Sequence, residues 1–88
     1  MDVLTRTKTE HNFINVEAKI KRVDLNSTDI YFINAVNARQ VFNILKYSVS
    51  FDGYNDVCVK NTHTISVSGE VDIRYNKNIK VLTIVSFI

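Results

Sequence analysis

The sequence is poor in the residue types that most catalytic and cofactor-binding motifs require. Its 88 residues include a single cysteine, Cys58, and two glycines, Gly53 and Gly69. One cysteine excludes an internal disulfide framework and favours a cytosolic protein. Two isolated glycines exclude the glycine-rich loops that hold phosphates and dinucleotides. No Ser–His–Asp arrangement stands out either, so we expect no enzyme and no cofactor.

Long apolar segments and a strong net charge are also missing. The longest apolar run, near the C-terminus, is interrupted by Thr83 and Ser86 and is too short to span a bilayer. Residues 1–12 lack the apolar core of a signal peptide. The net charge of +2, from 11 basic and 9 acidic residues, neither demands a polyanionic partner nor imitates DNA. We therefore expect no membrane association and a cytoplasmic location.

Helix-forming residues are scarce, and β-branched residues are abundant. Alanine and glutamate occur three times each, whereas valine, isoleucine and threonine together supply 29 of the 88 residues. Because β-branched side chains suit sheets better than helices, we expect more strand than helix. The apolar share of 45% and the charged share of 23% are ordinary for a folded soluble domain. The length predicts one small domain over residues 1–88.

A regular alternation predicts a strand at residues 13–23. The apolar residues that would share one face are Ile14, Val16, Ala18 and Ile20. Turn-forming residues follow at 24–28, and residues 29–36 predict a second strand that pairs antiparallel with the first. Residues 1–12 fit either a short strand or a loose arm.

A helix is predicted at about residues 38–48. Asn37 is a favoured N-cap, and Gln40 follows three residues later, where its amide can reach back to the cap. Val36 and Val41 occupy the positions of a hydrophobic staple. These signals together predict where the helix begins.

A longer helix, from Ser27 or Thr28 to residue 47, is the alternative. It would place bulky apolar side chains around its whole circumference, which a small domain has little means to bury. The shorter helix keeps its apolar residues in one stripe, formed by Ala38, Val41, Phe42 and Leu45.

The remainder of the chain predicts strands at residues 57–61, 63–75 and 79–88. One face of the second strand would carry Ile65, Val67, Val71, Ile73 and Tyr75. Gly69 interrupts this strand, either as a bend or as the centre of a hairpin loop that pairs Val67 with Val71.

A second hairpin loop is predicted at residues 76–78, because Asn78 can adopt the left-handed conformation. The last strand, 79–88, is apolar on both faces, so it should be central or covered on both sides. The elements together predict an α+β fold with a mainly antiparallel sheet of four to six strands and the helix packed on one face. Their order is (β)ββαβββ, with residues 1–12 as the optional first strand.

The stretch SFDGYNDVCVKNTH, residues 50–63, holds most of the conventional chemistry of the chain. Asp52 and Asp56 could serve as calcium ligands, but their spacing does not match an EF-hand loop. Cys58 and His63 stand too far apart along one strand to cooperate, and they have opposite parity. We interpret the stretch as a turn followed by a strand, and we expect no metal site.

Aromatic and basic residues are the remaining candidates for contacts with a partner. The predicted binding residues are Tyr31, Tyr54, Tyr75, Arg74, Lys77 and Lys80. Arg74, Lys77 and Lys80 surround the predicted hairpin, where basic groups beside an aromatic ring can follow a nucleic-acid backbone. The last strand has more apolar surface than one short helix covers, which favours a homodimer through it.

The first functional hypothesis is a small non-enzymatic protein that binds another protein as an inhibitor or accessory factor. Its size and its AT-rich composition, with ten asparagines and ten isoleucines, suit a phage- or mobile-element-encoded protein. Such a protein would act in the host cytoplasm on a host complex such as a defence enzyme. The alternative is a nucleic-acid-binding module that uses the basic hairpin at residues 74–80.

Overall fold

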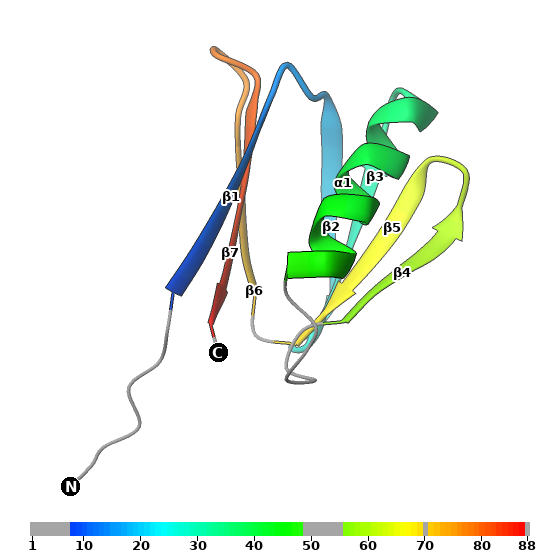
Figure 1. Cartoon of the computed structure of the whole chain (residues 1–88), viewed down its shortest axis with the longest axis vertical. Coiled ribbons are helices and arrows are strands. Elements are labelled where there is room, and N and C mark those ends of the chain that lie inside the picture. Colours follow the sequence, from blue (N-terminus) through cyan, green and yellow to red (C-terminus); the bar gives the residue numbers. More distant parts are fainter. Residues whose placement is uncertain (1–7, 49–55, 70, 88) are drawn as a thin grey trace, which may run out of the picture.

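The fold contains seven strands and one helix in the part of the chain that the structure describes. The computed structural model describes residues 8–48, 56–69 and 71–87 (Figure 1). The elements are β1 (Lys8–Ile14), β2 (Ala18–Asp24), β3 (Ser27–Phe32), α1 (Ala35–Ser48), β4 (Asp56–Asn61), β5 (Thr64–Ser68), β6 (Val71–Asn76) and β7 (Val81–Phe87). Every strand pair is antiparallel. The predicted α+β class with one helix is confirmed.

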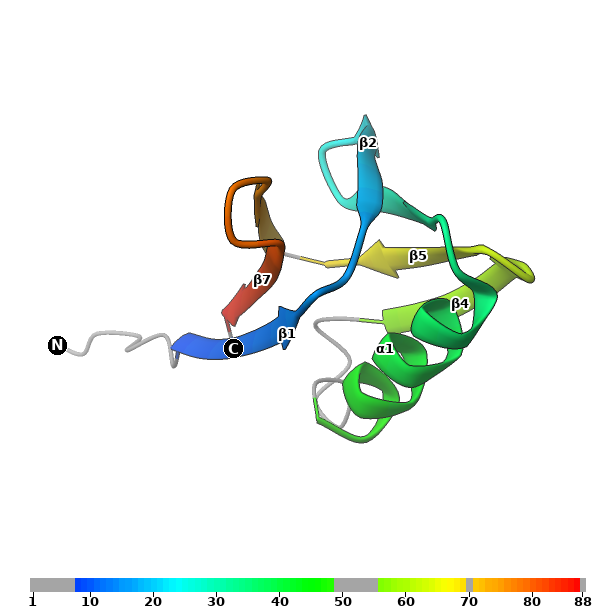
Figure 2. The ribbon, with the colours of Figure 1, turned by 90° about the horizontal axis from the view of Figure 1, so that it is seen from above.

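The strands form two sheets in place of the single sheet that the sequence predicts. Sheet A has the order β1-β7-β6, and sheet B has the order β2-β3-β5-β4. Seen from above, sheet A stands beside sheet B, and α1 packs over β3, β4 and β5 of sheet B (Figure 2). The strand number exceeds the predicted four to six because residues 13–23 and 63–75 each divide between the two sheets.

The predicted strand at residues 13–23 breaks at Asn15. Asn15 has a φ of 62°, in the left-handed region that asparagine tolerates better than most residues. Its N–H donates to the Lys80 carbonyl at 2.7 Å. The residues before Asn15 therefore join sheet A, and those after it join sheet B. As a result Phe13 is buried, whereas Ile14 is 70% exposed.

The expected antiparallel pairing of the next two strands is confirmed, between β2 and β3. Their turn is short: Leu25 and Asn26 connect the strands, and the Asn26 N–H donates to Asp24 Oδ1 at 2.7 Å. The alternative helix from Ser27 or Thr28 is contradicted, because both residues lie in β3.

Gly69 carries the chain from β5 in sheet B to β6 in sheet A. Its φ of 100° is a conformation that side chains with a Cβ resist. The predicted hairpin between Val67 and Val71 is wrong, because Val67 pairs with Thr28 on β3 and with Val57 on β4. Of the two predicted alternatives, the bend is therefore the one that the chain adopts.

The prediction that the last strand is central is confirmed, because β7 pairs with β1 on one side and with β6 on the other. Leu82 and Ile84 point into the core, where both are buried. With both edges of β7 hydrogen-bonded, a dimer through this strand would have to use its outer face. The predicted docking of Ile88 lies outside the described residues.

The loop between β6 and β7 is longer than the predicted 76–78. It spans residues 77–80, and its left-handed residue is Lys80, with a φ of 52°, rather than Asn78. The N–H of Asn78 donates to Asn76 Oδ1 at 3.0 Å, which satisfies it in an ordinary conformation. The predicted hairpin exists, but a different residue closes its loop.

The helix α1 begins three residues before the predicted start. Asn34, rather than Asn37, is the N-cap, and its Oδ1 accepts the N–H of Val36 at 2.8 Å. The earlier start leaves Val36 61% exposed, so it does not form the predicted staple with the buried Val41. The predicted end at residue 48 is confirmed.

One core joins both sheets and the helix. Its buried members are Phe13, Val16, Ile30, Phe32, Ala38, Val41, Leu45, Ile65, Val67, Leu82 and Ile84. Sheet A supplies residues of β1 and β7, sheet B those of β3 and β5, and α1 its predicted apolar stripe. Burying side chains of this size contributes about 1.5–3 kcal/mol each, so the core is the main source of stability.

Candidate functional site

Three of the predicted binding residues lie together on sheet A. Arg74, Tyr75 and Lys77 line a shallow depression of about 530 Å³ near the β6–β7 loop. The other residues that line it are Glu10, Asn12, Asn76, Ile79, Val81 and Thr83. The sequence groups Arg74 and Lys77 with Lys80 around the hairpin; Lys80 does not line this depression, and the sequence does not place Glu10 and Asn12 beside the other two.

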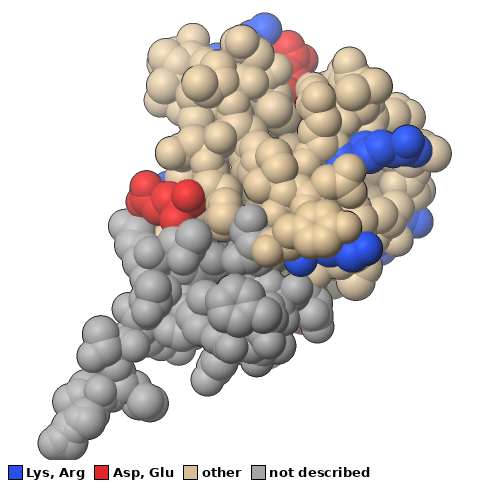
Figure 3. Space-filling model, in the orientation of Figure 1, with Lys and Arg blue, Asp and Glu red and all other residues tan. Residues whose placement is uncertain are grey.

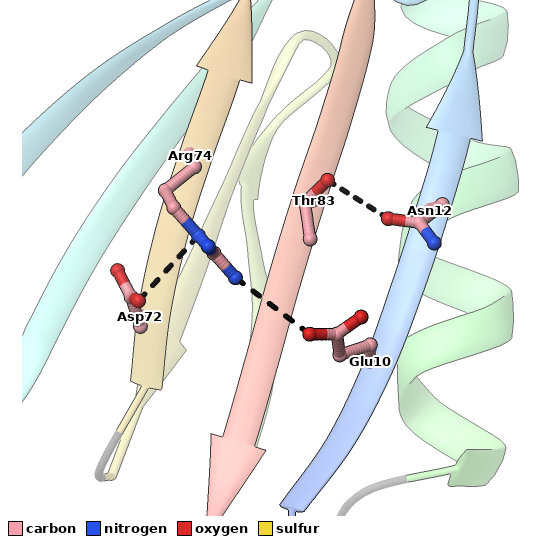
Figure 4. A network of polar contacts seen from close by, with 5 residues as sticks. All are labelled: Glu10, Asn12, Asp72, Arg74 and Thr83. Carbon is pink, nitrogen blue, oxygen red and sulfur yellow. Dashed lines mark hydrogen bonds and ion pairs between the residues drawn. The ribbon is translucent and has the colours of Figure 1, made fainter.

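The charges around this depression are largely neutralised within the protein. Arg74 Nη2 lies 3.8 Å from Oε1 of Glu10 on β1, and Arg74 Nε lies 3.5 Å from Oδ2 of Asp72 on the same strand. Beside these ion pairs, the Thr83 hydroxyl donates to Asn12 Oδ1 at 2.8 Å (Figure 4). An arginine shared by two carboxylates is a weak anchor for a phosphate.

Lys80 is similarly engaged. Its ammonium group donates to Glu17 Oε1 at 3.0 Å, joining the β6–β7 loop to the segment between β1 and β2. The hydrogen bond and the charge of Glu17 raise the pKa of Lys80 above its ordinary value. Of the three predicted basic contacts, two therefore already have acidic partners.

The predicted tyrosines do not converge on one place. Tyr31 lies on β3 of sheet B, where its ring stacks on His63 with centroids 6.0 Å apart. The side chain of Tyr75 packs partly against the core. Tyr54 lies outside the described residues, as do Asp52 and the predicted turn around it.

The candidate thiol and histidines also lie apart. Cys58 is exposed on β4, His63 is in the β4–β5 turn, and His11 is on β1 in the other sheet. Among the described residues, no group of three or more histidine, cysteine, aspartate or glutamate side chains is placed to hold a metal ion.

A second depression separates α1 from the end of sheet B, and its lining is apolar. This groove, the α1–β4 groove, has a volume of about 840 Å³. Its lining residues are Ala35, Val36, Ala38, Arg39, Phe42, Asn43, Val59, Asn61, Thr62 and Ile65. A mostly apolar lining with a few polar side chains is typical of binding sites, and the volume lies within their usual range of about 300–1,000 Å³.

Local structure explains why the groove exists. Because Asn34 caps α1 early, the helix gains a turn that carries Val36 over the open side of sheet B. On the opposite wall, Val59 is 57% exposed on β4, the edge strand of the sheet. Phe42 forms the partly buried floor between them. The two valines are apolar groups that the fold leaves open to solvent.

The groove has a basic rim. Arg39 lines it, and the Lys46 ammonium lies 5.9 Å from the centroid of the Phe42 ring. The helix contains no acidic residue, and none occurs among the described residues that line the groove. Figure 3 shows basic side chains on the face that carries α1, with acidic groups lying away from the helix. The groove thus favours apolar and negatively charged ligands.

Sequence reasoning missed the groove. The sequence predicts Val36 as part of a staple and Val59 as part of a strand whose place in the sheet it does not reveal, and no pattern in it points to Arg39. One signal was present: a helix whose only charges are basic, followed by the alternating segment DVCVKN. Neither feature becomes a site until the fold places that strand at the edge beside the helix.

Comparisons with known proteins supply no relative from which a function could be transferred. No family model, no curated protein and no solved structure matches this chain. In the described part of the chain, no helix is both long enough and apolar enough to cross a membrane.

Proposed function

We propose that this protein is a non-enzymatic binding protein that holds an apolar segment of another protein in the α1–β4 groove. The segment would carry acidic side chains beside its apolar ones. The single observation that supports this proposal most is the combination of exposed apolar walls, Val36 and Val59, with a rim whose charges are basic.

The chemistry of the groove favours a peptide over a small polar ligand. Val36, Phe42 and Val59 offer apolar contacts along the length of a segment. Asn43 and Asn61 provide amide groups for its backbone. Arg39, which lines the groove, would attract acidic residues and disfavour basic ones, which adds specificity.

The nucleic-acid alternative has less support. It depends on Arg74, Lys77 and Lys80, and the ion pairs of Arg74 and Lys80 reduce the charge available to phosphates. That the target is a host complex, such as a defence enzyme, stays a prediction from size and composition.

The test uses a library of random dodecapeptides displayed on phage and selected on the immobilised protein. We expect enriched peptides with apolar residues and neighbouring aspartate or glutamate. Fluorescence anisotropy with synthetic copies should show that Val36→Glu weakens binding by at least about tenfold, equivalent to 1.4 kcal/mol.

Ile79→Glu is the matched control, because Ile79 is 62% exposed and lines the depression on sheet A. It should change the peptide affinity less than about twofold. If Ile79→Glu abolished binding and Val36→Glu did not, the sheet A depression would be the site and the groove proposal would be wrong. Selection of basic peptides instead of acidic ones would also contradict the groove proposal.

A further inference from the structure

Within the described part of the chain, the edge strand β4 presents a defined set of backbone groups that no other strand pairs. The N–H of Phe32 donates to the His63 carbonyl at 2.7 Å, and the N–H of Gly69 donates to the Asn26 carbonyl at 2.8 Å. Both bonds continue the β3–β5 ladder at the odd-numbered residues His63 and Gly69, which flank β5 (Thr64–Ser68), so the odd-numbered residues of β5 face β3. Because the backbone groups of successive residues alternate in direction, the even-numbered residues of β5 face β4.

The register then fixes which groups of β4 point outward. Ser66, an even-numbered residue of β5, is paired with Cys58. The N–H and C=O of Cys58 are therefore directed into the sheet. Those of Val57 and Val59 are directed to the open edge, where none of the described strands follows β4 in the sheet order.

We infer that a second copy of this chain binds this edge, so that two β4 strands pair antiparallel about a twofold axis at Cys58. Only that register pairs both outward residues of one copy with both of the other: Val57 opposite Val59, and Val59 opposite Val57. Each of these pairs can form two hydrogen bonds. The four-stranded sheets would join into one continuous sheet.

Residue types along β4 agree with self-pairing. Valine stands opposite valine at both hydrogen-bonded positions, a combination that packs well across antiparallel strands. The central positions 57, 58 and 59 carry no charged side chain, so no like charges meet there in this register.

The other edge of sheet B does not have this self-complementarity. β2 carries Lys19, Lys21 and Arg22 within four consecutive residues, all exposed. Two copies of such a strand would bring like charges together, which is a common protection of edge strands. The contrast favours β4 as the associating edge and a second copy as its occupant.

Pairing at β4 would also complete the α1–β4 groove. The side chains of Val57 and Val59 lie on the groove face of sheet B, because they are paired with the buried Val67 and Ile65. The partner's β4 would therefore extend the wall beside Val59. This inference does not depend on the groove binding a peptide, since the edge pairing uses only groups of β4 itself.

Disulfide cross-linking through Cys58 can test this register. At the axis it forms a non-hydrogen-bonded pair with its own copy, with Cα atoms about 4.5 Å apart, within the range that a disulfide spans. Diamide would oxidise the two thiols to a disulfide by accepting their two electrons and two protons. We expect the reduced full-length protein to form a covalent dimer rapidly on treatment with diamide.

Two controls distinguish the edge from random collision. In Cys58→Ser with Lys21→Cys, the only cysteine moves to the exposed β2 edge, and cross-linking should slow by at least about tenfold. Val59→Pro removes an outward N–H from β4 and should slow the cross-linking by a similar factor. Ile20→Pro removes an outward N–H from β2 and should leave the cross-linking rate unchanged. Circular dichroism checks that each variant folds.

Light scattering of the reduced wild type provides a readout without cross-linking. We expect the mass of a dimer at high concentration and a return towards the monomer on dilution, with Val59→Lys shifted to the monomer. A monomer at every concentration would overturn the inference. Equal cross-linking rates for the wild type and the relocated cysteine would overturn it as well.

Discussion

The two edges of sheet B, β2 and β4, have opposite chemical character although they border the same sheet. β2 is exposed along its length and carries three basic residues, Lys19, Lys21 and Arg22. β4 has Val57, Cys58 and Val59 at its centre, and its one described charged side chain, Lys60, is paired with Asp29 at 2.8 Å. Under the proposed pairing, the charges of β2 oppose association at that edge, and the uncharged centre of β4 directs it to the other.

Sheet A provides a third case. Its central strand β7 has no free edge, and the ion pair of Arg74 with Glu10 crosses the outer face of β7, beside the Arg74–Asp72 pair on β6 (Figure 4). These charged side chains therefore neutralise one another. The apolar groove and the unpaired edge occur together on the opposite side, beside α1, which is why we place the function there.

The largest expected effect concerns the strands that hold the two edges. Ile30 lies on β3, the strand next to β2, and Ile65 lies on β5, the strand next to β4. Both side chains are buried in the same core. Ile30→Ala and Ile65→Ala should each lower the free energy of unfolding by about 2–5 kcal/mol, because each leaves a cavity. Urea unfolding followed by circular dichroism measures this. A loss in only one variant would mean that the two edges are stabilised separately.

The next effect is specific to the β4 side. Asn34→Ala removes the N-cap of α1 and should lower the free energy of unfolding by about 1 kcal/mol. Because α1 packs on β4, β3 and β5, the first turn that carries Val36 should fray, and peptide binding should weaken as well. Asn37→Ala, at the incorrectly predicted cap, is the control. It should lower the free energy of unfolding by less than half as much as Asn34→Ala does.

A smaller effect should depend on pH. Burial without a hydrogen-bond partner at Nε2 lowers the pKa of His11 below its ordinary value of 6.5. The unfolded chain then binds the proton more tightly, so stability is full above pH 6.5 and falls as the pH drops below it. His11→Gln should lose less stability than the wild type between about pH 7 and about pH 5. An equal loss would show that another group titrates.

The smallest effect on stability should come from making β2 resemble β4. Lys19→Thr, Lys21→Val and Arg22→Thr change exposed side chains, and each should alter the free energy of unfolding by no more than about 0.5 kcal/mol. The combined variant should nevertheless associate more strongly than the wild type, because the like charges that oppose pairing are gone. If it stayed as soluble and as dimeric as the wild type, charge would not be what protects β2.

The sequence predicted most elements but not the places where the chain leaves one sheet for the other. The alternation around Phe13 and Val16 correctly indicates strand, yet Asn15 shifts the buried parity by one residue, which periodicity alone does not reveal. Gly69 gave a visible signal, because a glycine inside a strand pattern often marks a bend. The central position of β7 was predictable, since a strand apolar on both faces needs neighbours on both sides.

The candidate site was less predictable, because it arises from contacts between distant segments. The sequence predicts Arg74 and Lys77 as binding residues because they lie near a turn. It does not show that Glu10, which precedes Arg74 by 64 residues, neutralises that arginine. Val36 and Val59 look like ordinary core residues in the sequence. They become a surface only because Asn34 starts the helix early and because β4 is the last strand of its sheet.

The most direct test of the contrast between the two edges is a dilution series followed by ¹H–¹⁵N NMR correlation spectra of the reduced protein. We predict that the amide signals of Val57 and Val59 shift with concentration, while those of Ile20 on β2 and Thr83 on β7 stay constant. Shifts confined to β2 or to sheet A, or no concentration dependence at all, would contradict the claim that β4 is the associating edge.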